Sequence, residues 1–345
     1  MNITVLMGGT SAERDVSLAS GLRIAAALRS VGHAVTALDP ATGVIGQERE
    51  SAMLRAGVVK TEPPAMDALE ELSRASLSPS LGALPEVRQA DVVFLALHGG
   101  QGEDGTVQAL LDMVGAVYTG SGHLASALAM DKDLSKKLFR AAGVGTADWL
   151  MASADGRLPV AAEVRRVLGF PVIVKPSKQG STVGLSLVKS EDALVPAIAE
   201  ARQYDDEVMI ERFVPGRELT VAVLGDEALP VGEIRAKHEI YDYECKYTKG
   251  MAEEDFPANI PSEVAEEAKR QALHAFAALK LGGYARIDFR MTDTGELFCL
   301  EANTLPGMTE TSLVPQAAAA AGMSFPELCD RIARLALEQR SRRMP

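Results

Sequence analysis

The chain has 345 residues, of which 47% are hydrophobic, and a formal net charge of -12 at pH 7. This length allows two or three domains with an ample core. The negative charge argues against a nucleic-acid partner, because that binding relies on exposed Lys and Arg. Since the longest apolar runs fall far short of the roughly 20 residues that a membrane span requires, we expect a soluble protein with no membrane partner.

The first residues lack the positive region, the long apolar region and the cleavage site of an export signal, which predicts a cytoplasmic protein. The three cysteines, Cys245, Cys299 and Cys329, are too few and too scattered for a disulfide framework or a zinc site. We therefore expect ordinary reduced thiols.

Residues 1–125 alternate short apolar strands with helical patterns, which predicts an α/β domain with a parallel sheet. The expected strands cover residues 3–6, 34–38 and 91–97, and the expected helices cover residues 15–29 and a stretch from about residue 105. Between Thr42 and Pro85 we expect a helix plus long surface loops.

A helix predicted over residues 121–142, with Gly143 as its stop signal, opens a second unit over residues 126–205. This unit contains an apolar strand that begins near Phe170 and runs into a glycine loop. The third unit, residues 206–345, begins with apolar strands over 207–213 and 218–224 and ends in a hairpin followed by helices.

Residues 286–303 predict this hairpin, because both flanks alternate between polar and apolar side chains. The polar face carries Arg286, Asp288, Arg290, Glu301 and Asn303. The apolar face, expected in the core, carries Ile287, Phe289, Phe298, Leu300 and Ala302.

A tight two-residue turn at Thr294 and Gly295 would place Asp288 opposite Glu301, with Asn303 further along the same face. Like charges in that position are destabilising, so a positive group is expected between them. Oxygen ligands of this kind suit Mg²⁺. The alternative is a solvated polar face on which the two arginines neutralise the acids.

Residues 175–184 follow a strand and combine two glycines, two hydroxyls and two lysines. Glycine lets backbone N–H groups approach phosphate oxygens and lysine adds positive charge, so the loop is a candidate phosphate site or a plain connection. Lys132 could reach a nucleotide or lie on a helix surface. Glu211 and Glu218 are candidate partners of a base or ribose, or solvated loop charges.

Two glycine-containing segments of the first domain are further candidates. Residues 8–14 join a strand to a helix, where Glu13 serves either as a helix-end charge or as a substrate contact. Residues 98–105 hold four glycines at the carboxyl end of a strand, where open α/β sheets place ligands. This position favours a functional role for His98.

Taken together, these motifs resemble the D-alanine–D-alanine ligases of the ATP-grasp superfamily. The segments that carry the resemblance, in chain order, are residues 8–17, 98–105, 118–122, 130–132, 174–177, 241–247, 286–288 and 301–309. The resemblance implies a three-domain ATP-grasp fold, with an N-terminal parallel-sheet domain and with ATP gripped between the other two domains. It also implies a homodimer and a role in peptidoglycan precursor synthesis.

The resemblance implies that the donor D-alanine carboxylate attacks the γ-phosphate of ATP and that the second D-alanine then attacks the acyl phosphate. The residues that match the ligands of two Mg²⁺ (or Mn²⁺) ions are Asp288, Glu301 and Asn303. Those that match nucleotide contacts are Lys132, Lys175, Glu211 and Glu218. Those that match substrate and oxyanion contacts are Glu13 and His98 for the first D-alanine, Lys246, Ser312 and Leu313 for the second, and Arg286 and Gly307 for the oxyanion.

The resemblance also implies a lid over residues 241–249 that excludes water when Ser181, Tyr247 and Glu13 bond together. Relatives that accept D-lactate tend to carry phenylalanine where this chain has Tyr247, which favours D-alanine. The alternatives are a ligase that uses D-lactate or D-serine, another ATP-grasp carboxylate–amine ligase, and a nucleotide sensor without chemistry. The retained Arg286 and metal carboxylates argue against the sensor.

Overall fold

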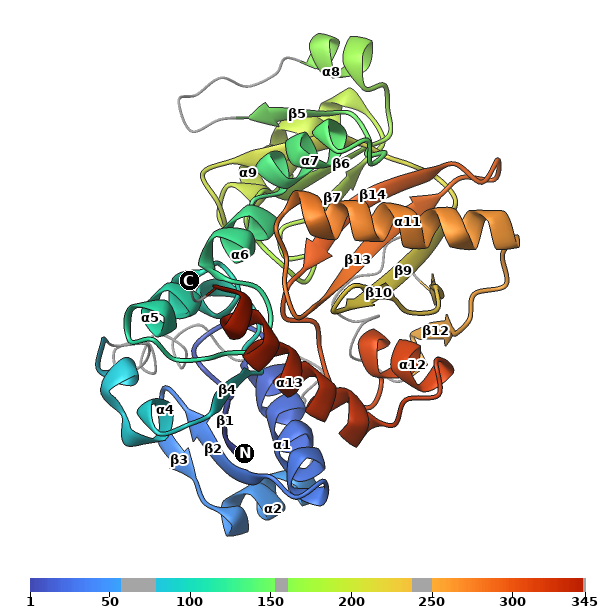
Figure 1. Cartoon of the computed structure of the whole chain (residues 1–345). Helices are drawn as coiled ribbons and strands as arrows, with labels where there is room; N and C mark the ends of the chain where they lie inside the picture. Colours follow the sequence, from blue (N-terminus) through green and yellow to red (C-terminus); the bar gives the residue numbers. More distant parts are fainter. Residues whose placement is uncertain (57–78, 153–160, 238–249, 344–345) are drawn as a thin grey trace.

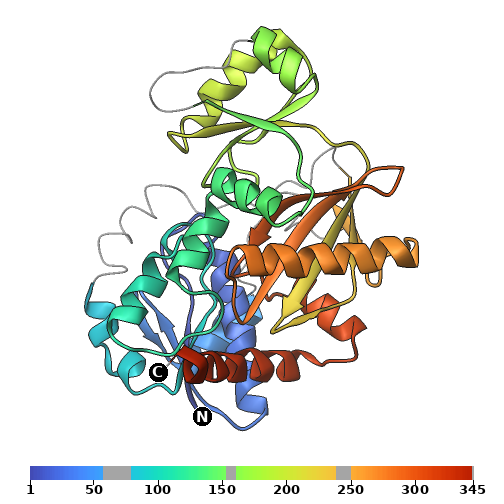
Figure 2. The same ribbon diagram turned by 45° about the horizontal axis from the view of Figure 1, so that its top comes forward.

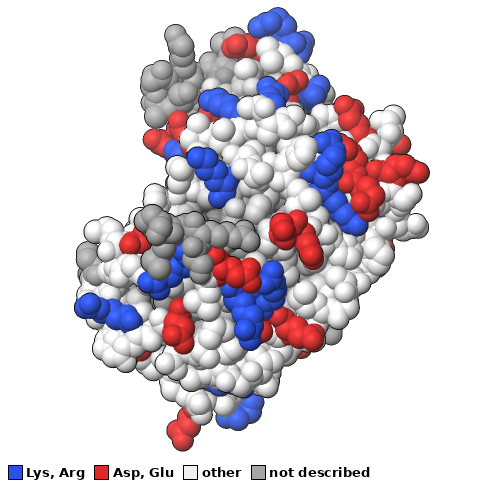
Figure 3. Space-filling model, in the orientation of Figure 1, with Lys and Arg blue, Asp and Glu red and all other residues white. Residues whose placement is uncertain are grey.

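The computed structural model describes residues 1–56, 79–152, 161–237 and 250–343. These residues form three sheets that follow one another along the chain, with helices packed on their faces (Figures 1 and 2). No helix in the described ranges is both long and apolar enough to cross a bilayer. Acidic and basic side chains intermingle on the face shown in Figure 3.

The N-terminal sheet confirms the predicted α/β pattern, since its central strand β1 pairs in parallel with both β2 and β4. The strands in spatial order are β3 (Gly43–Ile45), β2 (Ala34–Asp39), β1 (Asn2–Leu6) and β4 (Val92–Leu95). Only β3 runs antiparallel. The helices of this region are α1 (Arg14–Ser30), α2 (Gln47–Ala56), α4 (Pro85–Arg88) and α5 (Thr106–Met113).

The prediction of a single helix over residues 121–142 is wrong in one respect. The chain forms two helices there, α6 (His123–Met130) and α7 (Lys132–Ala141). Asp131 separates them in an extended conformation, and its side chain accepts a hydrogen bond from the N–H of Leu134. An aspartate in this position is a strong N-cap. The new helix start directs Lys132 toward the neighbouring sheets.

The middle sheet is antiparallel throughout. Its strands in spatial order are β5 (Trp149–Ala152), β8 (Val208–Arg212), β6 (Val172–Pro176) and β7 (Ser186–Val188). Helices α8 (Ala161–Val167) and α9 (Leu194–Ala201) bury their apolar side chains in the same cluster as the strands. The predicted boundary between residues 205 and 206 would separate β8 from the sheet in which it pairs.

The C-terminal sheet is built around β9 and β13, whose register covers eight residue pairs. Its strands in spatial order are β12 (Ala252–Asp255), β11 (Gly232–Ala236), β9 (Arg217–Leu224), β13 (Tyr284–Met291) and β14 (Leu297–Asn303), with β10 (Glu227–Ala228) on β9. Helix α11 (Ser262–Ala278) covers one face (Figure 1) and buries Ala268, Ala272 and Ala275 against it.

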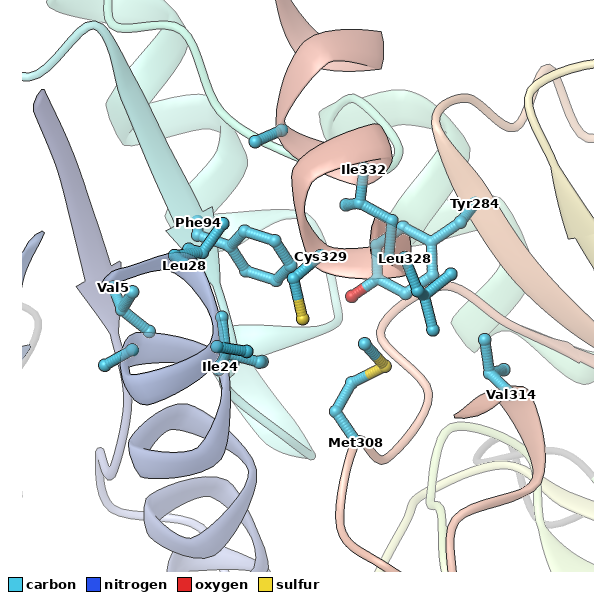
Figure 4. Close-up of a cluster of buried hydrophobic side chains, with 14 of the residues drawn as sticks. Val5, Ile24, Leu28, Phe94, Tyr284, Met308, Val314, Leu328, Cys329 and Ile332 are labelled. Carbon is cyan, nitrogen blue, oxygen red and sulfur yellow. The ribbon is translucent and has the colours of Figure 1, made fainter. Parts of the chain in front are cut away.

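Two helices beyond this sheet, α12 (Leu313–Ala320) and α13 (Phe325–Arg343), return toward the N-terminal sheet. Leu328, Cys329 and Ile332 of α13 share one buried cluster with Ile24 of α1 and Phe94 of β4 (Figure 4). The imidazole of His33 also pairs with Asp330 at 2.8 Å. The hydrophobic core of the first domain therefore includes residues from both ends of the chain.

Candidate functional site

A cleft lies between the middle sheet and the C-terminal sheet. The middle sheet contributes the glycine loop after β6, including Gly180 and Ser181, and the C-terminal sheet contributes Asp288 and Glu301. Apolar side chains line another part of the same cleft, namely Ile173, Val183, Leu185, Phe213, Val214 and Leu300. The cleft thus combines apolar walls with a charged region, as a nucleotide requires.

The glycine loop bends sharply at Ser181 and Thr182, whose φ angles are 51° and 59°. Positive φ is uncommon outside glycine and marks a position where the surroundings hold the backbone in place. Here the hydroxyl of Ser181 donates a hydrogen bond to Glu13 of the first domain. This contact brings the loop against the N-terminal domain and confirms the expected proximity of the two residues.

Lysines and carboxylates meet in pairs along the cleft. The ammonium of Lys132 donates to the carbonyl of Gln179 at 2.7 Å and lies 3.4 Å from Glu301. The ammonium of Lys175 lies 2.6 Å from Glu211. Both lysines that match phosphate contacts therefore line the cleft, each beside a carboxylate that the sequence also singled out.

Glu211 has a second lysine partner that the sequence analysis missed, Lys136 of α7. Burial alone would raise the pKa of Glu211, but the charges and hydrogen bonds of Lys136 and Lys175 outweigh it and hold the pKa at about 2. Lys136 lies four residues after Lys132, on the same helix face, and this spacing was the available signal.

Glu218, on β9, lies 3.4 Å from the guanidinium of Arg290. Arg290 also donates to the carbonyls of Val214 and Gly216, at 3.1 Å and 2.7 Å. Glu218 and Arg290 both line the cleft. The proposed base and ribose partners therefore lie on different strands of the two sheets that enclose the cleft.

The hairpin confirms that Asp288 pairs with Glu301, although two details of its prediction are wrong. The turn uses three residues, 293–295, since Thr292 donates its N–H to Glu296 at 2.9 Å and Gly295 has φ +81°. This shifts the register by one residue. A bulge at Leu300 shifts it back, because Phe289 pairs with Cys299 and Asp288 with Glu301.

In the part of β14 that precedes Glu301, the side chains expected to face the core face away from it, and those expected to face away are buried. Leu297 and Cys299 enter the core, not Phe298 and Leu300 as predicted. Leu300 instead lines the cleft. The period-two pattern of β14 fails here because the inserted residue changes which side chains point inward.

The acidic residues of the hairpin have protein partners. Asp288, only 6% exposed, accepts bonds from Arg286 at 2.9 Å, from Thr220 at 2.7 Å and from Asn303 at 3.0 Å. The described residues contain no group of three His, Cys, Asp or Glu arranged for a metal ion. The donor set of two carboxylates and an amide nevertheless has the oxygen chemistry that Mg²⁺ prefers, so these residues fit that ion.

Two loops of the first domain meet close to the glycine loop. Gly99 has φ +67°, and a Cβ at this position would lie 2.8 Å from the carboxylate of Glu13. Glycine is required for this approach. The adjacent His98 is buried, with Nδ1 2.8 Å from the carbonyl of Leu305 and Nε2 3.3 Å from Ser20. Both of its ring nitrogens therefore already contact protein atoms.

Burial lowers the pKa of His98, although the charge of Glu13 opposes this shift. The neutral ring donates its Nδ1 proton to Leu305, since a carbonyl can only accept. Ser20, in turn, accepts the N–H of Met308 at 3.1 Å. His98 and Ser20 thus hold the segment 305–308 against the first domain.

Glu103, in the same glycine-rich segment as His98, is a titratable residue that the sequence analysis did not single out. It accepts the N–H of Gly99 at 2.9 Å. Burial, reinforced by the charge of Glu13, raises the pKa of Glu103 to about 8. Glu103 is half-buried, and an acid with a perturbed pKa is a candidate functional residue.

Gly307 and Ser312 lie together at the start of α12. A Cβ on Gly307 would lie 2.8 Å from the hydroxyl of Ser312, which also accepts the N–H of Thr309 at 2.8 Å. Leu313 begins the helix and is buried. Lys246 and Tyr247 lie outside the residues that the structure describes, as does the predicted lid.

A cleft between two antiparallel sheets, with lysines and a glycine loop on one side and a carboxylate hairpin on the other, defines an ATP-grasp protein. The family models described as D-ala D-ala ligase N-terminus and D-ala D-ala ligase C-terminus match residues 2–121 and 138–334. The chain belongs to the D-alanine–D-alanine ligase family.

Individual relatives agree along almost the whole chain. It is 40% identical to the D-alanine–D-alanine ligase of Geobacter sulfurreducens, over 96% of this chain and 92% of the relative. It is 40% identical to that of Moorella thermoacetica, over 98% and 100%. The Bacillus anthracis ligase, solved in complex with ATP, superposes with a TM-score of 0.76 at 31% identity and covers 100% of both chains.

Proposed function

We propose that this chain joins two D-alanine molecules to D-alanyl-D-alanine, at the expense of ATP, for cell-wall precursor synthesis. The observation that carries the proposal is the hydrogen bond from Ser181 to Glu13. It joins the glycine loop that lines the cleft to the first domain, where residues 8–11 and 97–102 line a second pocket. A γ-phosphate in the cleft and a carboxylate in that pocket would therefore meet at one place.

In the first step a carboxylate oxygen of the donor D-alanine attacks the γ-phosphorus, the bond to the ADP oxygen breaks, and an acyl phosphate forms. Glu13 binds the ammonium group of the donor, and Lys132 and Lys175 bind phosphate oxygens. Each ammonium has three N–H donors, so Lys175 can bind a phosphate oxygen and keep its bond to Glu211. Glu211 and Glu218 hold the base and the ribose.

In the second step the amine of the acceptor D-alanine attacks the acyl carbonyl, and phosphate leaves as the amide forms. Arg286 and the N–H of Gly307 stabilise the oxyanion of the tetrahedral intermediate. Ser312, Leu313 and Lys246 hold the carboxylate of the acceptor. The acceptor ammonium loses one proton to water before the attack, since only the neutral amine is nucleophilic, and the nitrogen loses a second proton to the departing phosphate as the amide forms.

His98 has a positioning role in this proposal, in place of the direct substrate contact that the resemblance implied. Both of its ring nitrogens form hydrogen bonds within the protein, Nδ1 with the carbonyl of Leu305 and Nε2 with the hydroxyl of Ser20. These bonds fix the segment that carries Gly307. His98 thereby supports the oxyanion contact from the opposite domain.

We further propose that Asp288, Glu301 and Asn303 hold two Mg²⁺ (or Mn²⁺) ions. The ions would neutralise charge on the phosphates of ATP. The donor chemistry of these side chains supports this assignment, and Thr220 orients Asp288 through a 2.7 Å hydrogen bond. Since ATP is the phosphoryl donor, we place the reaction in the cytoplasm. The homodimer stays a prediction.

The test is phosphate release from ATP with Mg²⁺ and D-alanine, run beside L-alanine and beside D-alanine plus D-lactate or D-serine, with products identified by mass. ATP-dependent D-alanyl-D-alanine is the expected product. A product ending in D-lactate or D-serine would reassign the acceptor. Phosphate release with none of these products would rule out D-alanine as the substrate. Nucleotide binding without turnover would rule out a ligase activity.

A further inference from the structure

A buried group of three charges lies behind one wall of the cleft. Lys136 is fully buried, and its ammonium donates to one oxygen of Glu211 and, at 2.5 Å, to the hydroxyl of Thr146. Lys175 donates to the other oxygen of Glu211 at 2.6 Å. Glu211 and Lys175 line the cleft, whereas Lys136 does not. Lys136 therefore acts on a ligand only through Glu211.

The position of Lys136 is itself fixed from the C-terminal sheet. Thr146, which accepts from Lys136, donates its own proton to the carbonyl of Cys299 at 2.7 Å. The N–H of Cys299 donates a hydrogen bond to the carbonyl of Gly145 at 2.7 Å. Lys136 thus connects Glu211 of the middle sheet to β14 of the C-terminal sheet, and the Glu211 carboxylate has little freedom to rotate.

The two ammonium groups also determine what Glu211 offers to a ligand. A carboxylate between two lysines stays ionised, and an ionised carboxylate accepts hydrogen bonds but cannot donate them. The apolar walls beside it, Ile173, Phe213 and Val214, suit the flat face of a base. Adenine donates from its exocyclic amine, whereas hypoxanthine and guanine present a carbonyl oxygen at that position.

We propose that Lys136 is a positioning residue that orients Glu211 and keeps it an acceptor, so that the cleft selects a purine with an amine at position 6 over a purine with a carbonyl at that position. The inference rests on the proposed function, in which ATP fills the cleft with its base at Glu211. A carbonyl-bearing base would place an oxygen lone pair against the carboxylate and leave a buried polar group without its partner, which is a strong basis for rejection.

The test compares wild type with Lys136→Met, using ATP and ITP as alternative phosphoryl donors. ITP carries hypoxanthine, so a carbonyl replaces the amine. In Lys136→Met we expect the KM for ATP to rise about tenfold and the ATP-to-ITP ratio of kcat/KM to fall about tenfold, because a hydrogen bond to a charged group is weakened. The value of kcat with saturating ATP should change little, since Lys136 touches no reacting atom.

Lys137→Met is the matched control, because Lys137 is the next residue of α7, its side chain is 60% exposed, and its partner is Asp133 on the same helix. Its KM values and ATP-to-ITP ratio should equal those of wild type. Should Lys136→Met not fold, Lys136→Gln carries the same test, since the amide keeps an N–H donor for Glu211 but loses the charge.

A Lys136 variant with a lowered melting temperature but an unchanged KM for ATP and an unchanged ATP-to-ITP ratio would assign Lys136 a merely structural role and overturn the inference. Failure of the proposed function is seen separately, because wild type would then form no dipeptide from ATP and D-alanine. A wild type that makes dipeptide equally well from ITP would also overturn the inference.

Discussion

Ser181 donates a hydrogen bond to Glu13, although 168 positions separate the two residues in the chain. One residue belongs to the loop after β6 and the other immediately precedes α1. The contact therefore connects binding of the nucleotide to binding of the first amino acid. A change at either residue should affect the use of both substrates.

Ser181→Ala removes this bond without adding bulk. Since a hydrogen bond to a charged carboxylate contributes about 1.5–3 kcal/mol, we expect kcat/KM for D-alanine to fall roughly 13- to 160-fold. Steady-state kinetics with D-alanine as the varied substrate measures this. Ser186→Ala, on β7 of the same sheet, is the control, because Ser186 contacts only Glu200 among its described side-chain partners, at 3.4 Å. Equal losses in both variants would contradict the coupling.

Arg286→Lys replaces a forked donor by a point charge. Arg286 holds Asp288 through two nitrogens, at distances of 2.9 and 3.1 Å, and is the proposed oxyanion donor. We expect kcat to fall about 100- to 1,000-fold, as for loss of one oxyanion contact. Single-turnover measurement of dipeptide formation checks this. Arg270→Lys on the exposed surface of α11 should keep normal turnover, and a normal kcat in Arg286→Lys would remove Arg286 from the chemistry.

Gly307→Ala introduces a methyl group 2.8 Å from the Ser312 hydroxyl. The hydroxyl must move, so we expect a higher KM for the acceptor D-alanine and little change in the KM for ATP. Separate titrations of the two substrates measure this difference. The control is Gly46→Ala, where a Cβ would meet no atom within 4 Å. An increase confined to the KM for ATP would argue against the acceptor site at Ser312.

Glu103 should make stability depend on pH. In the folded chain the pKa of Glu103 is raised to about 8, well above the ordinary pKa of a glutamate, so the folded state binds more protons than the unfolded state between these two values. Stability therefore falls as pH rises through this window. Glu103→Gln should remove that part of the slope, which melting temperatures measured between pH 5 and 9 would reveal.

Glu296→Gln, at an exposed position of the hairpin turn, provides the comparison for Glu103→Gln. It should keep the slope of wild type. A Glu103→Gln variant with the same slope as wild type would show that Glu103 does not titrate in this range.

Asp288→Asn tests the metal assignment. The substitution keeps the size of the side chain but removes its charge, so we expect the Mg²⁺ concentration for half-maximal activity to rise at least tenfold, as for loss of a metal contact. Isothermal titration with Mn²⁺ in the presence of ADP gives a binding measurement that does not depend on turnover. Unchanged Mn²⁺ affinity would reject Asp288 as a ligand.

Much of the fold could be predicted because it follows local patterns. The strands over residues 3–6 and 34–38 and the helix over residues 15–29 appear within one residue of the predicted bounds. The pairing of Asp288 with Glu301 was also predicted, although a longer turn and the bulge at Leu300 compensate for one another. Period-two alternation gives the pairing of a strand but not the position of an inserted residue.

Other features depend on contacts between distant residues. Lys136 looks like any helical surface lysine until β8 brings Glu211 beside it. The break at Asp131 depends on one capping bond that competes with a continuous helical pattern. The partners of His98, Ser20 and Leu305, lie 78 and 207 positions away. No local pattern encodes such separations.

The packing of α13 on the N-terminal sheet has a consequence for synthesis of the chain. Residues 1–97 emerge from the ribosome first, but Phe94 and Ile24 find part of their apolar cover only when residues 325–343 follow. Until then the early domain leaves that face open to water, and chaperones or self-association compete for it. A nascent chain arrested before residue 325 should therefore be protease-sensitive within residues 1–97. The strands of this region should become protected from protease only near the end of translation.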